Sequence, residues 1–115
     1  MDIKNHEIDN HKIAEISAEE VIIAKLEDAL DLIGTLYYDG YDKVILYEQN
    51  LTPAFFDLKT KIAGDILQKF TQYQMSVTIV GHFESYGSQS LADFITESNK
   101  GRQVNFVSSL SEALR

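Results

Sequence analysis

The chain of 115 residues contains no cysteine and carries a formal net charge of -8 at pH 7. Its length suits one compact fold, so we expect a single domain spanning residues 1–115. The absence of cysteine excludes disulfide bonds and thiolate metal sites, and the acidic balance argues against nucleic-acid binding, in which basic residues must neutralise phosphates.

No apolar stretch approaches the roughly 20 residues that a membrane-spanning helix needs. The first residues also lack the basic start and apolar run of a signal peptide, so we expect a cytoplasmic protein with no membrane association. The acidity is concentrated in residues 1–40, which hold ten acidic and three basic residues. A solvated surface explains this excess, and a basic partner protein is the alternative.

The chain opens with a predicted antiparallel hairpin. Asp9 and Asn10 separate the runs 2–8 and 11–17, and both residue types favour tight turns. The side chains expected to point inward are Ile3, Ile13 and Ile16.

A first helix is predicted to follow the hairpin. Ser17–Glu20 has the spacing of a capping box, but the β-branched run at 21–23 favours extended structure and moves the expected start to near Lys25. Apolar residues then recur at helical spacing as far as Tyr37, and Gly40 provides a stop.

The stretch Lys43–Phe70 predicts a buried strand, a sharp turn and a long amphipathic helix. The strand covers 43–47 and is bounded by turns. Thr52 is expected to cap the helix, Pro53 occupies its first position, and the helix is predicted to run to about Gln72.

The remaining residues continue the alternation of strands and helices. Strands are predicted at 77–80 and 104–107, with a helix capped by Ser90 between them and a short terminal helix opened by Ser109. The order β-β-α-β-α-β-α-β-α predicts an α/β fold with about four helices and a mostly parallel five-stranded sheet, with the hairpin at its edge.

Five stretches carry a resemblance to a known family. They are Asp28–Leu32, Asn50–Pro53, Phe55–Leu58, Ile62–Phe70 and Glu97–Val104. Through them the chain resembles the bacterial domain of unknown function 4180 over nearly its whole length. That family is similar, more distantly, to the STAS domains of anti-sigma-factor antagonists, which implies a STAS-like fold.

The resemblance implies a phosphorylation switch that this chain lacks. In STAS antagonists a serine following an aspartate at the start of the second helix is typically phosphorylated. Here Phe56-Asp57 resembles the start of that motif, but Leu58 has no hydroxyl. The nearest hydroxyls belong to Thr52, explained as a helix cap, and Thr60, explained as a surface helix residue.

Polar residues at the carboxyl ends of the predicted strands form the candidate site, because ligands of parallel α/β sheets bind at that edge. A serine, a histidine and a glutamate there would suit a hydrolase, but no G-x-S-x-G motif or oxyanion hole supports one. A turn residue, a loop histidine and helix caps explain the same residues structurally. With the aspartate of the STAS-like motif, the candidate ligand or partner site comprises Glu48, Asn50, Thr52, Asp57, His82 and Ser108.

Other sites find less support in the sequence. Dinucleotide and phosphate-loop motifs are absent, and we expect no cofactor. His6 and His11 have a spacing that would suit weak metal binding, but a metal site needs three or four ligands, so a solvated hairpin is the preferred interpretation. Tyr37, Tyr38 and Tyr41 form a cluster of the kind used by binding surfaces.

Our leading hypothesis is a small regulatory module that binds another protein through the second helix and its preceding turn. The lack of catalytic motifs favours a non-enzymatic role. The alternative is a small-molecule binding or enzymatic domain with its site at the strand ends. A homodimer through the sheet edge or the tyrosines is compatible with either hypothesis.

Overall fold

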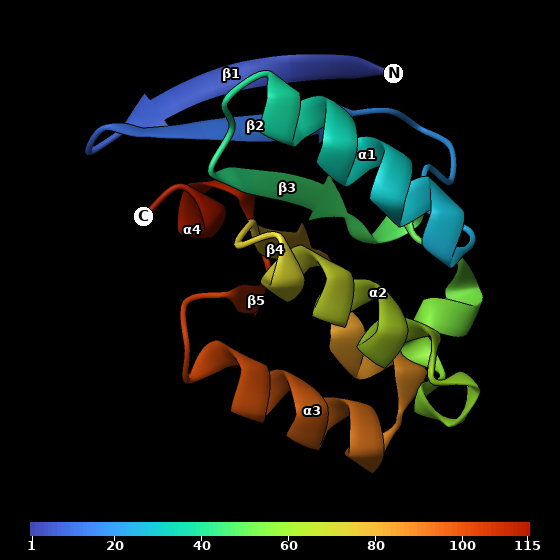
Figure 1. Cartoon of the computed structure of the whole chain (residues 1–115). Coiled ribbons are helices and arrows are strands. Elements are labelled where there is room, and N and C mark those ends of the chain that lie inside the picture. The colour runs from blue at the N-terminus through green and yellow to red at the C-terminus, as the bar shows by residue number, and fades with distance from the viewer.

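The computed structural model describes residues 1–115 and confirms the predicted α/β fold (Figure 1). One sheet has the strand order β1-β2-β3-β4-β5, in which β1 and β2 are antiparallel and all other neighbours are parallel. None of the helices is long and apolar enough to cross a membrane. The elements are β1 (Asp2–Ile8), β2 (His11–Ser17), α1 (Leu26–Tyr38), β3 (Lys43–Tyr47), α2 (Ile62–Gln72), β4 (Ser76–Val80), α3 (Gln89–Asn99), β5 (Val104–Val107) and α4 (Leu110–Ala113).

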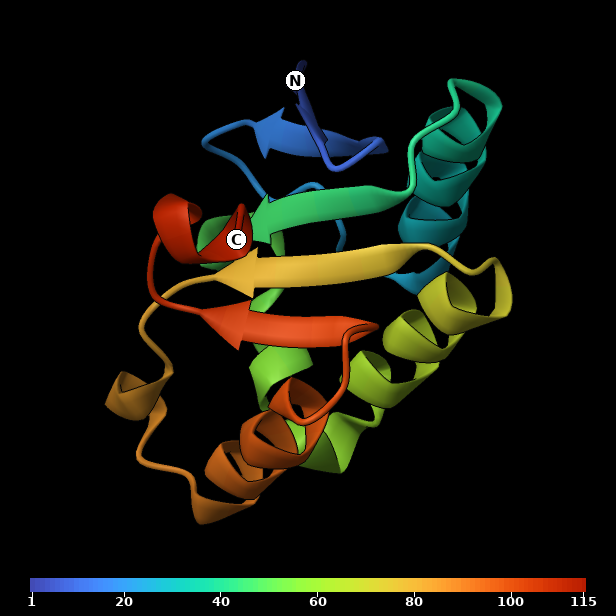
Figure 2. The same ribbon diagram turned by 90° about the vertical axis from the view of Figure 1, so that its left-hand side faces the viewer.

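The two faces of the sheet are covered unequally. The parallel strands lie in sequence order, so successive crossovers of one handedness place α1, α2 and α3 on the same face. Only the four-residue helix α4 packs on the other face. In Figure 2 this helix lies in front of the strands, α1 and α2 lie to their right, and α3 lies below them. Much of the second face is therefore left open.

Alternation along the strands sends side chains into a large core and a small one. Ala14, Ile16, Val44 and Leu46 contribute to the large core under the three long helices. The intervening residues on the opposite face join a small cluster beneath α4, which contains Ile13, Ile45, Val80 and Ala113. Of the isoleucines predicted to point inward, Ile16 and Ile13 are buried on opposite faces, and Ile3 is half-buried opposite Ile16.

The second helix is shorter than predicted. In place of a helix from Pro53, the chain makes two 3-10 turns, at Pro53–Phe56 and Leu58–Thr60, before α2 begins at Ile62. The Thr60 hydroxyl donates to two carbonyls in this segment, of Ala54 and Asp57, each at 2.8 Å. Lys61 then adopts a left-handed conformation with φ 65°, which interrupts any continuous helix. Thr60 is thus a turn residue and not a helical surface residue.

The expected helix starts were right for α1 and α4 and wrong for α2 and α3. Helix α1 follows Lys25 as predicted, and Ser109 caps α4 by accepting from the Glu112 N–H at 3.2 Å. Thr52, however, makes no capping hydrogen bond. Helix α3 is capped by Ser88 instead of Ser90, because the Ser88 hydroxyl accepts from the Leu91 N–H.

Candidate functional site

Glu48 connects β3 to the loop that follows β4. It accepts hydrogen bonds from the His82 backbone N–H at 3.1 Å and from the Tyr86 hydroxyl. The Tyr86 ring stacks on Phe56, with ring centroids 4.9 Å apart. Gly81 leaves room for this carboxylate, since a Cβ there would lie 2.6 Å from Glu48 Oε1. Both carboxylate oxygens therefore act in holding the loop.

The Glu48 carboxylate also fixes the protonation state of Tyr86. Burial, followed by the hydrogen bond and charge of Glu48, raises the pKa of the Tyr86 hydroxyl far above its usual value of 10.0. The phenol stays neutral and remains a hydrogen-bond donor over the physiological range.

Asn50 is fully buried and joins three segments through its side chain and backbone. Its Oδ1 accepts from the Tyr47 N–H at 3.0 Å, and its Nδ2 donates to the carbonyls of Ala18 and Glu20. The Asn50 carbonyl accepts from the backbone N–H groups of residues 22 and 23. Three of the four hydrogen bonds that this side chain can make are therefore formed within the fold, and two of them fix the chain between β2 and α1.

The other three predicted site residues lie apart from any shared centre. Thr52 is half-buried without a side-chain hydrogen bond, and exposed Asp57 accepts from the Lys59 N–H at 3.3 Å. Ser108 donates to Glu112, one turn further along the chain. No hydrogen bond joins the Ser108 hydroxyl to the His82 ring, so the nucleophile–base contact of a hydrolase is missing.

A polar trio on the open face of the sheet was not predicted from the sequence. Glu15 is only 5% exposed, and its Oε1 lies 2.9 Å from His6 Nε2. Its Oε2 accepts from the Tyr47 hydroxyl at 2.8 Å. Side chains alternate between the two faces along each strand, and these three lie on the same face. The sequence alone does not reveal this, because it does not give the order and register of β1, β2 and β3.

The pKa values of Glu15 and Tyr47 move in opposite directions within this trio. Burial alone would raise the pKa of Glu15, but the bonds from His6 and Tyr47 outweigh burial and leave that pKa below its usual value. Burial and the Glu15 carboxylate raise the pKa of Tyr47 to about 12. The trio therefore holds an ionised carboxylate between two bonded neighbours.

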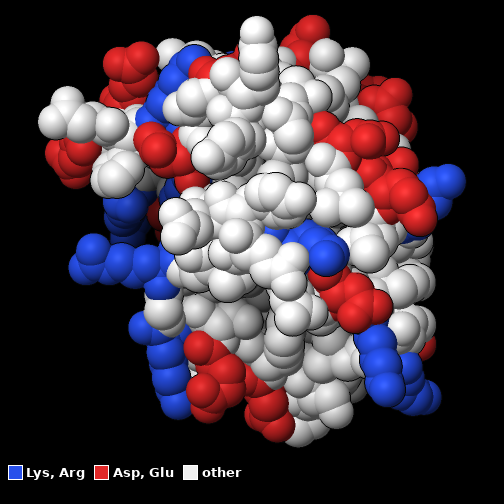
Figure 3. Space-filling view, viewed as in Figure 1, with Lys and Arg blue, Asp and Glu red and all other residues white.

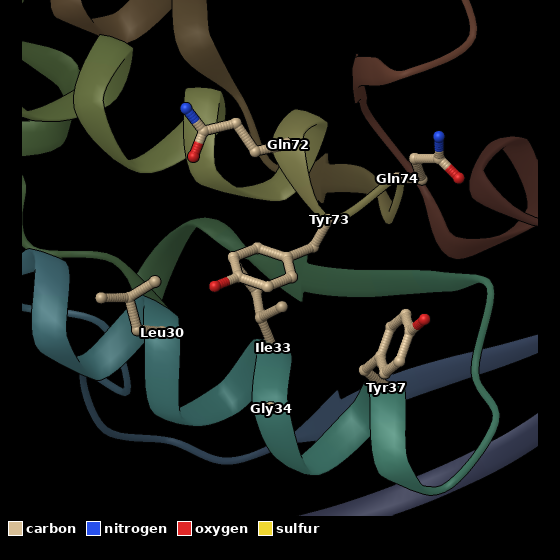
Figure 4. A pocket seen from close by; sticks show the side chains of 7 residues that line it. All are labelled: Leu30, Ile33, Gly34, Tyr37, Gln72, Tyr73 and Gln74. Atoms are coloured by element: carbon tan, nitrogen blue, oxygen red, sulfur yellow. The ribbon is translucent and has the colours of Figure 1, made fainter.

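A groove lies between α1 and the end of α2 (Figure 4). It is a hollow of about 540 Å³ with a mostly apolar lining. Figure 4 shows Tyr73 reaching from the end of α2 towards Ile33 on α1, with Tyr37 further along α1. We call it the tyrosine groove, and its lining residues are Leu30, Ile33, Gly34, Tyr37, Gln72, Tyr73 and Gln74.

The tyrosines around the groove are exposed. Tyr37 is 65% exposed, Tyr73 is 49% exposed and the adjacent Tyr38 is 90% exposed. Tyr41, which the sequence grouped with Tyr37 and Tyr38, is half-buried beneath the Lys12 ammonium, 4.4 Å from its ring centroid. The sequence thus located part of this surface but could not place Tyr73 beside it.

The histidines of the hairpin do not share a metal-binding arrangement. His6 bonds to Glu15, whereas His11 Nδ1 lies 3.8 Å from Asp42. No group of three or more His, Asp or Glu side chains comes together as a metal ion would require.

A family model for a domain of unknown function, DUF4180, matches residues 8–115, which include every element from β2 to α4. The chain belongs to the DUF4180 family. No curated protein matches the sequence. No solved structure matches it either. The family assignment therefore agrees with the fold but assigns no activity to the DUF4180 site residues described above.

Proposed function

We propose that this DUF4180 protein is a regulatory module that binds a basic protein segment in the tyrosine groove. The observation that carries the proposal is the exposure of Tyr37, Tyr38 and Tyr73 around an apolar hollow. Tyrosine is enriched at the energetic centres of protein interfaces, where its ring is buried by the partner. A group of exposed aromatic side chains around an apolar hollow is typical of an interaction site.

The chemistry of the partner follows from the charge around the groove. Spacings of four and seven residues place Glu27, Asp31 and Tyr38 in one row on α1, and Gly34 of the groove lies in the same row. In Figure 3 an uncharged surface covers the centre, where Figure 1 shows the space between α1 and α2, and acidic side chains gather to its right. A partner segment with an apolar anchor flanked by Lys or Arg complements this arrangement.

The likeness to STAS domains supports a regulatory role, since STAS antagonists act by binding other proteins. The groove meets α2 at its last residue, Gln72, and does not include the turn before α2 that the sequence singled out. The lack of a hydroxyl at Leu58 removes the phosphorylation step from this comparison. We therefore propose that charge and shape complementarity control the binding of the partner protein, without phosphorylation of a serine.

A pair of glycine variants tests the groove. Gly34 and Gly64 are both exposed and helical, and a Cβ at either meets no atom within 4 Å. Gly34→Gln places a side chain at the groove, whereas Gly64→Gln places one elsewhere on α2. Both changes should favour helix formation, so a loss of binding cannot be attributed to unfolding.

The measurement is quantitative affinity capture from the native host, with cross-linking to locate the captured protein. We expect a basic protein cross-linked near Tyr73, lost with Gly34→Gln, retained with Gly64→Gln and weakened by added salt. Retention by Gly34→Gln, or an acidic partner, would refute the proposal. Light scattering gives a further check, because self-association abolished by Gly34→Gln would make a second copy the occupant instead.

The alternative function, small-molecule binding at the carboxyl ends of the strands, has one observation in its favour. A pocket of about 330 Å³ at the ends of β2 and β3 is lined by Glu15, Tyr47 and Gln49, among others. A thermal-shift screen against metabolites tests it. A ligand at 100 times its dissociation constant stabilises the protein by about 2.7 kcal/mol, and Glu15→Gln should remove that shift.

A further inference from the structure

The open face of the sheet carries a second hollow, at the opposite end of the strands from the predicted site. It has a volume of about 790 Å³ and adjoins a smaller one of about 330 Å³. Lys43 and Ser76, the first residues of β3 and β4, line the larger hollow, and Arg102, which precedes β5, lines both. We call the two together the amino-end hollow. Four residues are shared by both parts, and they are Lys43, Arg102, Asn105 and Arg115.

Three of these shared residues are basic. Arg102 and Arg115 are the only arginines of a chain whose net charge is -8, and both lie here with Lys43. Figure 3 shows basic side chains along the left-hand edge, the side on which Figure 1 places α4 and the C-terminus. A concentration of positive charge in an acidic protein calls for an explanation beyond solubility.

None of these three basic groups of the amino-end hollow forms an ion pair with an acidic side chain. Neither guanidinium takes part in a side-chain hydrogen bond or an ion pair within the protein. Lys43 Nζ donates to a neutral group, the Ala113 carbonyl, at 2.7 Å. Burial lowers the pKa of Lys43.

Three acidic residues, Asp9, Asp42 and Glu112, also line the amino-end hollow, and none forms an ion pair with Lys43 or Arg102. Asp42 accepts from the Lys12 N–H at 2.8 Å and lies near His11. The Ser108 hydroxyl, and more weakly Arg115, lower the pKa of Glu112, whose Oε1 also accepts from Ser109. Asp9 lies in the hairpin turn at the outer end. None of the three neutralises Lys43 or Arg102.

Neutral donors complete the lining. Ser76 lies in the larger part, and Thr78, which is 2% exposed, lies in the smaller part. Neither hydroxyl has a hydrogen-bond partner within the protein, so both are free to donate to a ligand. Guanidinium groups bind phosphate oxygens in pairs, and a volume of this size suits a small metabolite.

We propose that the amino-end hollow binds a phosphate group, either as inorganic phosphate or as the phosphate ester of a small molecule. Lys43, Arg102 and Arg115 would bind phosphate oxygens through charge-assisted hydrogen bonds, and Ser76 and Thr78 would bind the remaining oxygens. The tyrosine groove lies on the other side of the sheet between α1 and α2, and Gln74 is the one residue that lines both the groove and the larger part of the amino-end hollow.

The test is an NMR titration of the full chain at low salt with inorganic phosphate and, separately, with glycerol phosphate. We expect saturable shifts in the amides of Lys43, Ser76 and Arg102, and tighter binding of one probe identifies the source of the phosphate group. The variant Arg102→Gln Arg115→Gln should bind at least about 10-fold more weakly, or about 1.4 kcal/mol.

A charge-matched control separates a built site from general attraction. Lys59→Gln Lys61→Gln removes the same charge from an exposed turn outside the amino-end hollow and should leave the affinity within about twofold. Equal weakening in the two variants, or no saturable shift with either probe up to about 10 mM, would overturn the proposal.

Discussion

The two ends of the parallel sheet use their polar residues in opposite ways. At the carboxyl end, Glu48 and Asn50 bond to the backbone of neighbouring segments, and Ser108 bonds to Glu112. At the amino end, the guanidinium groups of Arg102 and Arg115 make no hydrogen bond or ion pair within the protein. Polar groups whose hydrogen bonds are formed within the protein stabilise the fold, whereas charged groups without such partners remain available to a ligand. Ligands of α/β folds usually bind at the carboxyl ends of the strands, but in this protein the polar residues at that end serve mainly to hold the fold together.

The largest expected effect is that of Asn50→Ala. Removing the amide leaves the Tyr47 N–H and the carbonyls of Ala18 and Glu20 without their buried partner. Each unsatisfied buried group costs about 1–3 kcal/mol, so we expect the free energy of unfolding to fall by about 3–5 kcal/mol in urea titrations.

The neighbour Gln49 supplies the control for Asn50. It is exposed and donates one hydrogen bond, of 3.2 Å, to the Ala18 carbonyl. Gln49→Ala should cost less than about 0.5 kcal/mol. Similar losses for the two variants would mean that the carboxyl end is not held together by Asn50.

A smaller loss is expected for Gly81→Ala, which places a methyl group 2.6 Å from Glu48 Oε1 and 2.7 Å from Glu48 Cβ. Overpacking of this kind costs about 1–3 kcal/mol. The same substitution at exposed Gly64 meets no atom within 4 Å and should stabilise α2 by roughly 0.5–1 kcal/mol. Thermal unfolding of both variants checks the opposite signs, and a stable Gly81→Ala protein would show that the Glu48 connection is dispensable.

The strand pattern predicted the order of elements because each strand is a short apolar run bounded by turn residues, as in Lys43–Tyr47. The open face could not be predicted in this way. It depends on the sequential strand order, which places three helices on one side and brings Arg102 and Arg115 near Lys43 from distant parts of the chain. Helix propensity also predicted a continuous helix through Lys61, whereas Lys61 adopts a left-handed conformation that separates the 3-10 turns from α2.

The candidate site shows the same limit. The rule for strand ends led to Glu48 and His82, and the structure does connect them, but through the His82 backbone and not its imidazole. Whether a polar residue forms a hydrogen bond through its side chain or its backbone depends on the tertiary structure, which the spacing of residues in the sequence does not reveal. The trio of His6, Glu15 and Tyr47 escaped prediction for the related reason that its strands come together only in the folded sheet.

A pH-dependent effect is expected from Tyr47, which donates to Glu15 near the carboxyl end of β3. Its pKa is raised from 10.0 to about 12 in the folded protein. Between these values the unfolded state loses its proton first, so this contribution is complete below pH 10 and is lost as the pH rises to about 12. The advantage of the wild type over Tyr47→Phe in chemical unfolding should therefore shrink over this range.

The exposed Tyr38 is the matched control for Tyr47, because its hydroxyl has no hydrogen bond and its side chain is 90% exposed. Tyr38→Phe should keep the pH profile of the wild type. A constant difference between the wild type and Tyr47→Phe across the alkaline range would contradict the proposed bond to Glu15.

The smallest effect is expected at the amino end, for Arg102→Gln. Since Arg102 has no acidic partner and lies in a hollow with Lys43 and Arg115, its removal should change the free energy of unfolding by less than about 0.5 kcal/mol. Lys100→Gln, by contrast, breaks the exposed ion pair with Glu97 and should lower stability by about 0.2–1 kcal/mol.

Phosphate in the unfolding buffer adds the decisive comparison, because a bound anion stabilises only the folded state. It should stabilise the wild type and Lys100→Gln more than Arg102→Gln, and a marked loss of stability in Arg102→Gln without phosphate would show that this arginine, like Asn50, serves the fold.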